Sequence, residues 1–317
     1  MREEILKVLT EEDIKYCSDL GITLDSDLLD PKIDSVFKAI FTTDSEESRT
    51  ALACFLSAVL GRKVTKVTIG NNEPAVNGLG DKQSVFDVHV RFEFEDEADI
   101  EMQMRITDDL EVRAEYNTAR LFGAQAARGK NYGDMHEAVT IFVLNQTLFH
   151  DTENFFDKYV YTGMTGRILK GKTMIFFIEL SKLAEILKKP VSEMTPVERW
   201  GVFYKYLTAP EKKEVVNEII SREEGIKMAA KVLEGLSRDE EERIRHYHRL
   251  KYEIDRESQL IYADKMGFKR GMDEGMEAGM AKGIIKTAKN ALAMGLSLEQ
   301  IEQFTGLSRE EIVGKKG

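Results

Sequence analysis

Cysteine is scarce in this chain of 317 residues, which contains only Cys17 and Cys54. Small secreted domains depend on several disulfides, so two cysteines exclude that class of scaffold. The histidines offer no zinc site, because His246 and His248 flank a single tyrosine and no cysteine joins them at zinc-ligand spacing. The sequence therefore predicts a fold that is stabilised by its apolar core alone.

Long apolar runs are also absent. No stretch of roughly eighteen apolar residues occurs, so we expect no membrane-spanning helix. The first residues, MREEILKVLTEED, are charged throughout and do not resemble a signal peptide. These features predict a cytoplasmic protein with no membrane partner.

An excess of basic charge is missing as well. The formal net charge is -11 at pH 7, whereas sequence-independent binding of DNA usually shows as a basic patch. Any contact with nucleic acid must therefore depend on a local basic surface within an acidic protein.

The chain does contain enough apolar residues to fold. Hydrophobic residues make up 42% of it, including 16 Phe and 10 Tyr, which is typical of a globular protein and not of a disordered one. Turn residues and helical spacing predict helices over 34–41 and 48–60, the second ended by Gly61, and then a strand over 63–69. Residues 71–82 are rich in turn formers and are predicted to form a loop.

The clearest pattern covers residues 85–106. Apolar and polar residues alternate over 85–94 and again over 100–106, and the acidic stretch 95–98 between them is predicted to be a turn. Period-two alternation predicts strands with one buried face, and the short turn joins them into a hairpin. The register stays open because the length of the turn is not defined by the pattern.

The second half becomes helical. A helix is predicted over 111–128, ended by Gly129, followed by buried strands over 138–144 and 173–179 and a further strand over 155–162. Helical spacing then dominates from 190 to 262. We predict a helical lead-in at 1–25, a mixed α/β domain at 26–185, a helical subdomain at 186–262 and a C-terminal region at 263–317.

Asp87 and Glu101 are the candidate metal ligands. Residues two apart on a strand share a face, so Glu101 and Gln103 point the same way, and hairpin pairing can place Asp87 beside them. Two carboxylates, the backbone carbonyl of Met102 and waters would form an octahedral oxygen site that suits Mg²⁺ or Mn²⁺. Such a metal can bind a scissile phosphate and activate water, which the neutral Gln103 could orient. The alternative is a hairpin with a solvated polar face.

The helix after the hairpin supplies a local basic surface. Over 112–132 four basic residues stand against one acidic residue. Arg113, Tyr116 and Arg120 fall on one helical face, along which a phosphate backbone could lie. The alternative is an amphipathic helix whose arginines pair with the acidic hairpin turn.

Ordered motifs extend these observations along the chain. They are DSVFKAIF (34–41), NNE (71–73), DKQSVFDVHV (81–90), DIEMQ (99–103), R-x-x-Y (113–116), ARGKNY (127–132), IELSKL (178–183) and TAKNALAMGLSLEQIEQFTGLSREEI (287–312). Their order resembles the recombination-promoting nuclease (Rpn) family, bacterial PD-(D/E)XK nuclease-type proteins often labelled transposases. The resemblance covers residues 28–313, nearly the whole chain.

The resemblance implies a restriction-endonuclease-like α/β core, with a central mixed sheet flanked by helices, and Mg²⁺-dependent DNA cleavage in recombination or mobile-element biology (Mn²⁺ or Ca²⁺ being alternative ions). By motif, Asp87 matches the metal-binding aspartate, Glu101 the second acid, and Gln103 the position of the superfamily's lysine. Asp34 resembles a first-helix acid that completes such sites, and Lys38, one turn later, could contact phosphate. The alternative for Asp34 is a helix cap or a first-turn charge, the more frequent role of an aspartate before an apolar run.

The neutral Gln103 and the acidic chain keep a second function open. It is a catalytically weak protein on a nuclease fold that binds DNA or protein. Metal binding separates the two functions, because an active core should be stabilised by Mg²⁺ or Mn²⁺.

Glycine recurs at every fourth position from Gly267 to Gly283. Each glycine costs a helix up to about 1 kcal/mol relative to alanine, so close packing against a second helix, as in a homo-oligomer, would compensate. A linker and a low-complexity expansion are the alternatives. Two short helices over 297–304 and 308–313 follow, and the acidic start of the second favours protein contact over reading of a major groove.

Overall fold

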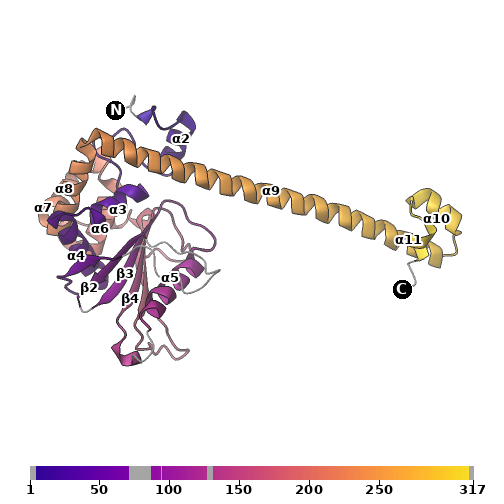
Figure 1. Cartoon of the computed structure of the whole chain (residues 1–317), viewed down its shortest axis with the longest axis horizontal. Helices are drawn as coiled ribbons and strands as arrows, with labels where there is room; N and C mark the ends of the chain where they lie inside the picture. The colour runs from indigo at the N-terminus through magenta and orange to yellow at the C-terminus, as the bar shows by residue number, and fades with distance from the viewer. Residues whose placement is uncertain (1–4, 71–86, 94, 127–130, 314–317) are drawn as a thin grey trace. The chain divides into compact units, whose positions relative to one another are not determined.

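The computed structural model describes residues 5–70, 87–93, 95–126 and 131–313, and the chain divides into two compact units, Met1–Tyr252 and Glu253–Gly317. A six-stranded mixed sheet forms the centre of the first unit, with helices on both faces (Figure 1). Its strand order is β1-β2-β3-β4-β6-β5. The strands are β1 Val67–Ile69, β2 Val88–Phe92, β3 Asp96–Gln103, β4 Ala138–Leu144, β5 Phe156–Tyr159 and β6 Thr173–Glu179. The predicted α/β fold with a central mixed sheet is confirmed.

Strand β4 lies inside the sheet because its sequence, AVTIFVL, is apolar on both faces, and all seven residues are buried. It pairs in parallel with β3 on one side and with β6 on the other. The two edges are antiparallel, since β2 pairs with β1 and β3, and β5 pairs with β6. The carboxyl ends of β3, β4 and β6 therefore meet at one edge of the sheet.

Helices cover the two faces in unequal numbers (Figure 1). Helix α5, Leu110–Ala124, is the crossover between β3 and β4 and covers one face. Its contact with the sheet is a cluster of buried side chains, namely Leu110, Ala114, Phe142, Leu144 and Phe177. The other helices of the first unit are α2 Glu11–Asp19, α3 Asp34–Thr42, α4 Glu46–Leu60, α6 Pro196–Tyr206, α7 Lys213–Arg222, α8 Glu224–Arg238 and the start of α9 Glu240–Ala293.

Aromatic rings join α3, α4 and α6. The Trp200 ring stacks on Tyr204 with centroids 5.6 Å apart, and it meets Phe55 edge-on at 5.3 Å. Phe41 brings α3 into the same cluster, with its ring 5.4 Å from that of Phe55. Each such pair adds about 0.5–1.5 kcal/mol beyond its buried area, so this cluster holds α3 in place beside the sheet.

Most predicted elements are present, with shifted ends. Strands β4 and β6 match the predictions residue for residue, whereas β1 and β5 are shorter than predicted. Helix α4 begins at Glu46, two residues before the predicted start, because the Ser45 hydroxyl caps it by accepting from the backbone N–H of Ser48. Helix α5 ends at Ala124, earlier than the predicted Arg128. The predicted loop at 71–82 and the predicted Gly129 cap lie outside the described residues.

The hairpin of β2 and β3 is confirmed, but the predicted position of its turn was wrong. The turn was placed at 95–98, whereas β3 already begins at Asp96, and the chain reverses through Glu93 and Glu95, whose φ angles are 49° and 76°. The alternative, a hairpin with a solvated polar face, does not hold near the end of β3, because α5 covers that part of the face and both Asp99 and Glu101 are buried.

The second unit contains α9 from Glu253 onward, α10 Leu298–Thr305 and α11 Arg309–Val313. The two short predicted helices are confirmed, and a small core of Ala288, Ala291, Ile301 and Ile312 holds them to α9. A Cβ added at any glycine from Gly267 to Gly283 in the every-fourth-residue series would meet no atom within 4 Å. The described helices include none long and apolar enough to cross a bilayer.

Packing of α8 on α4 yields a first prediction. A Cβ added at Gly225 would lie 2.2 Å from the Cβ of Cys54, so Gly225→Ala must push the helices apart. We expect a loss of about 1–3 kcal/mol in the free energy of unfolding, measured by urea denaturation. Gly235→Ala, in the same helix with no atom within 4 Å, is the control and should gain up to about 1 kcal/mol. Equal effects of the two variants would contradict the packing.

Candidate active site

The hairpin register brings Asp87 and Glu101 together. Val88 pairs with Ile100 across the antiparallel strands, so Asp87, one residue before, lies opposite Glu101, one residue after. Alternation along β3 puts Asp99, Glu101 and Gln103 on the face that α5 covers. The predicted pairing of the two acids is thereby realised in the structure.

Side chains from β3 and α5 hold Glu101 in place. Asn117 of α5 donates from Nδ2 to Glu101 Oε1 at 2.7 Å, and Gln103 donates from Nε2 to Glu101 Oε2 at 3.1 Å. Arg113, one turn before Asn117, places its Nη2 3.7 Å from Glu101 Oε2. Neutral donors and one cation therefore fix both oxygens of this buried carboxylate. Sequence reasoning missed Asn117, although its spacing of four from Arg113 places it on the same helical face.

Helix α3 contributes a cation to the same site. Lys38 Nζ lies 2.6 Å from Asp34 Oδ2 and 3.0 Å from Asp87 Oδ1. Asp34 and Lys38 are four residues apart, so they share one face of α3, and the aromatic cluster directs that face toward the hairpin. Lys38 is thus the ammonium group between two of the predicted site carboxylates.

Burial and mutual repulsion perturb these groups. Burial, followed by the charge of Asp34, raises the pKa of Asp87 well above its usual range, against the opposing effect of Lys38. Burial would lower the pKa of Lys38, but Asp87 and Asp34 outweigh it and hold that pKa above its ordinary value. Perturbed titrating groups of this kind cluster at functional sites.

Asp99 is the acid that sequence reasoning missed. Burial, then the charges of Glu101 and Asp87, raises the pKa of Asp99 well above its usual range. Neither of its carboxylate oxygens makes a hydrogen bond of good geometry with the described residues. The available signal was its position two residues before Glu101 within the DIEMQ motif.

Unpaired buried polar atoms gather around this site. Among the described residues, Asp34 Oδ1, both oxygens of Asp99, and Nε and Nη2 of Arg113 are buried without a hydrogen-bond partner. Native proteins satisfy nearly all buried polar atoms, so a group of exceptions in one place points to a missing ligand or to function.

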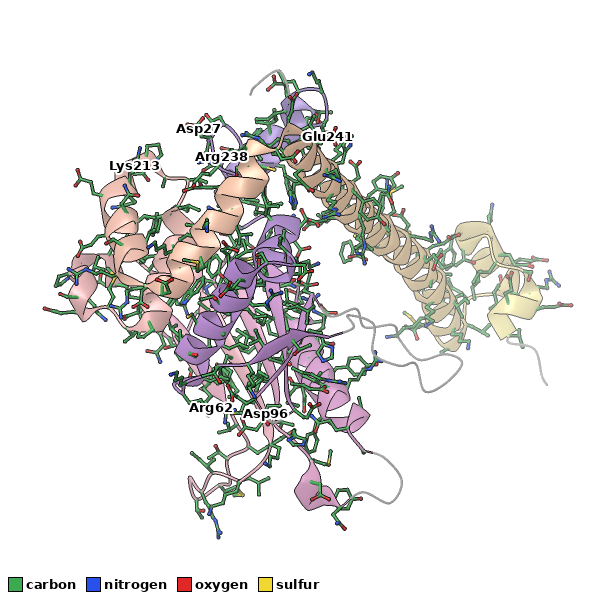
Figure 2. The ribbon with its side chains drawn as sticks, turned by 60° about the vertical axis from the view of Figure 1, so that its left-hand side comes forward. Asp27, Arg62, Asp96, Lys213, Arg238 and Glu241 are labelled. Carbon is green, nitrogen blue, oxygen red and sulfur yellow. The ribbon has the colours of Figure 1, made fainter. Side chains whose placement is uncertain are left out.

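The remaining predicted residues lie as follows. Arg120 places its guanidinium carbon 5.8 Å from the Tyr116 ring centroid, further along α5 than Arg113. In the acidic stretch 95–98, Asp96 pairs with Arg62 at 3.1 Å and Glu97 pairs with Arg91 at 3.2 Å (Figure 2 labels Arg62 and Asp96). Met102 is buried, and its side chain points to the face opposite Glu101.

The oxygen donors of the site fit a hard divalent cation. No three His, Cys, Asp or Glu side chains among the described residues converge as a ready-made metal site. A magnesium ion, however, commonly binds one or two carboxylates and retains several waters. Asp87 and Glu101 supply two carboxylates whose burial and repulsion a cation would relieve, so the donor set fits.

Comparison with protein families identifies a match over most of the chain. The family model described as PD-(D/E)XK nuclease family transposase matches residues 31–263, more than half of the chain. This match includes every candidate site residue and confirms the family suggested by the sequence motifs. Searches of the curated proteins and of the solved structures each find no match.

The raised pKa of Asp99 makes a pH-dependent prediction. The pKa of Asp99 is higher in the folded chain than in the unfolded chain, so protonation of Asp99 favours the folded state. This contribution to the free energy of unfolding is fully present below the unfolded pKa of about 3.9, and it is lost as the pH rises through the folded pKa. Asp99→Asn should therefore raise the melting temperature at pH 8 in EDTA, and this gain should shrink toward pH 4.

The exposed Asp108 of the loop before α5 offers the control, since Asp108→Asn should change the melting temperature little at either pH. A gain from Asp99→Asn that is equal at both pH values would contradict a buried carboxylate with a raised pKa.

Proposed function

Because the chain belongs to the PD-(D/E)XK nuclease family transposases, we propose that it is a divalent-metal-dependent DNA endonuclease that hydrolyses phosphodiester bonds. The observation that carries the proposal is a group of four carboxylates beside two basic side chains. Asp99 and Glu101 are buried and Asp34 and Asp87 are partly buried, and Asp34 Oδ1 and both oxygens of Asp99 have no hydrogen-bond partner among the described residues. A cluster of like-charged carboxylates lowers the stability of a fold, and proteins retain such a cluster where their function requires it.

Asp87 and Glu101 would hold Mg²⁺, with the Met102 carbonyl as a third oxygen ligand, and Mn²⁺ or Ca²⁺ could bind the same donors. When bound, the metal would polarise the scissile phosphate and activate water. Asn117 and Gln103 orient Glu101 by their hydrogen bonds. Since Gln103 donates its amide N–H to Glu101, its amide oxygen can accept from a water and orient it.

Basic groups near the carboxylates would position the phosphate backbone. Arg113 has buried guanidinium nitrogens without hydrogen-bond partners among the described residues, so a phosphate oxygen could take that place. Tyr116 and Arg120 would extend this surface along α5, and Lys38 would neutralise charge at the cleavage centre. A local cationic surface of this kind offsets the net charge of -11.

The wider biological proposals follow from the family. DNA is the proposed partner, in recombination or mobile-element biology within the bacterial cytoplasm. The bare glycine series of α9, Gly267 to Gly283, is a proposed contact between copies of the chain, because nothing in the described chain packs on it. The four-part division at residues 25, 185 and 262 remains a prediction.

Plasmid nicking tests the proposal directly. Wild-type protein should nick supercoiled DNA with Mg²⁺ or Mn²⁺ and not with EDTA. Asp87→Asn and Glu101→Gln should each lower the rate by about a hundredfold or more, because each removes a charged metal ligand. The matched control is Glu97→Gln, on the same face of β3 at its other end, where Glu97 pairs with Arg91 at 3.2 Å.

Nicking that survives both site variants would overturn the site. A folded wild type that cleaves nothing with any metal, but binds DNA, would establish the alternative function of a binding module on a nuclease fold, as the neutral Gln103 suggests.

Lys38 makes a separable prediction. Lys38→Met removes the ammonium that lies between Asp34 and Asp87, so a divalent cation loses a competitor. The Mn²⁺ concentration for a half-maximal rise in melting temperature should fall several-fold, while nicking slows by about tenfold or more. Lys231→Met, which breaks the surface pair with Glu47, should change neither value. Weaker Mn²⁺ binding by Lys38→Met would contradict this role.

A further inference from the structure

A second polar site lies at the carboxyl ends of β4 and β6. It is a cavity of about 560 Å³, and none of the candidate active-site residues lines it. Asn145 and Gln146, which directly follow β4, and Ser181, just after β6, form part of its wall. The edge of a sheet at the carboxyl ends of parallel strands is where α/β proteins commonly bind ligands.

A buried lysine lies in the wall of this cavity. Lys32 is only 3% exposed, and its Nζ lies 3.1 Å from Asp30 Oδ2. The Asp30 carboxylate also accepts from the backbone N–H groups of Thr23 at 2.8 Å and Lys32 at 2.9 Å, and from the Thr208 hydroxyl at 3.2 Å. Asp30 therefore compensates Lys32 and has little capacity left for a second cation.

The second cation of the cavity is Lys205, at the end of α6. Its Nζ donates to the Leu180 carbonyl at 2.7 Å, and in the described part of the chain no carboxylate lies within ion-pair distance of it. Burial, and then the charge of Lys32, lowers the pKa of Lys205. Since Asp30 compensates Lys32, Lys205 is the cation of this cavity whose charge no carboxylate of the described residues contacts.

One neutral side chain with a donor to spare, Gln146, belongs to the same lining. Gln146 uses its Oε1 to accept from the backbone N–H of Ile106 at 3.1 Å, which leaves its amide nitrogen to donate to another acceptor. Carboxylates appear only on exposed lining residues, Asp19 and Glu211. Lys205, Lys32 and the amide nitrogen of Gln146 thus supply cations and a neutral donor, the chemistry that recognises an oxyanion.

We propose that this cavity binds a phosphomonoester anion, with Lys205 and Lys32 as its cationic partners and Gln146 as a neutral donor. Its volume lies in the range of about 300–1,000 Å³ that small-molecule sites occupy. The same group occurs on free nucleotides and on the phosphorylated end of a DNA strand. The site is independent of the carboxylates proposed for cleavage.

Calorimetry on the full chain in EDTA tests the proposal, since neither metal nor cleavage is needed. The probes are inorganic phosphate, a deoxynucleoside monophosphate, and one oligonucleotide with and without a 5′-phosphate. Lys205→Gln keeps a donor toward Leu180 but removes the charge, and it should weaken phosphate binding at least tenfold, whereas Lys205→Arg should retain it. Lys213→Met is the matched control, because this exposed lysine begins α7 outside the cavity (Figure 2).

Preference for the phosphorylated oligonucleotide would assign the site to DNA ends. Binding of the free nucleotide alone would assign it to a small molecule. Both outcomes support binding of a phosphomonoester in the cavity. A wild type that binds no phosphate probe, or a folded Lys205→Gln that binds as tightly as the wild type, would overturn it. Should Lys205→Gln fail to fold, phosphate should still protect Lys205, and not Lys213, from acetylation in the wild type. If the wild type binds the phosphate probes but does not nick plasmid DNA, the proposed nuclease activity is refuted and the proposed phosphate site is not.

Discussion

Strand β3 carries Asp99 and Glu101 into the interior because α5 covers the face of the sheet on which they lie. Burial of a carboxylate costs several kcal/mol unless other groups compensate it. The surrounding structure supplies that compensation unevenly: Asn117 and Gln103 donate to Glu101, Lys38 neutralises Asp87, and Asp99 receives little. The positions of α3 and α5 relative to the hairpin are thus tied to the charge that the hairpin buries.

Gln103, at the position where the motif predicts the superfamily's lysine, is neutral, yet the site is not without positive charge. Lys38 comes from α3 and Arg113 from α5, so both cations reach the carboxylates from helices on either side of the hairpin. Net charge over a whole chain says little about such a site, because charge at a few ångströms outweighs distant charge screened by water and salt.

Local patterns predicted the hairpin, the buried strands and the meeting of Asp87 with Glu101, because alternation depends only on neighbours along the chain. The burial of Asp99 could not be predicted in this way, since it depends on α5 folding back over a polar face. The contact of Lys38 with Asp87 depends likewise on an aromatic cluster drawn from three helices. The cavity at Lys205 is more remote still, because Lys32 donates to the Lys205 carbonyl across most of the first unit's sequence.

The carboxylates of the site and the basic groups that compensate them also differ in when they can come together during folding. Asp87, Asp99 and Glu101 belong to one hairpin, which closes a short loop at small entropic cost. Lys38 joins only after α3, which is distant from the hairpin in the sequence, has docked, and this is a slower class of event. A chain that has formed the hairpin alone therefore gathers like charges before their counterions arrive. Dissolved cations and mild acid should then act on the folding rate itself, by favouring an intermediate that the chain's own basic groups have not yet reached.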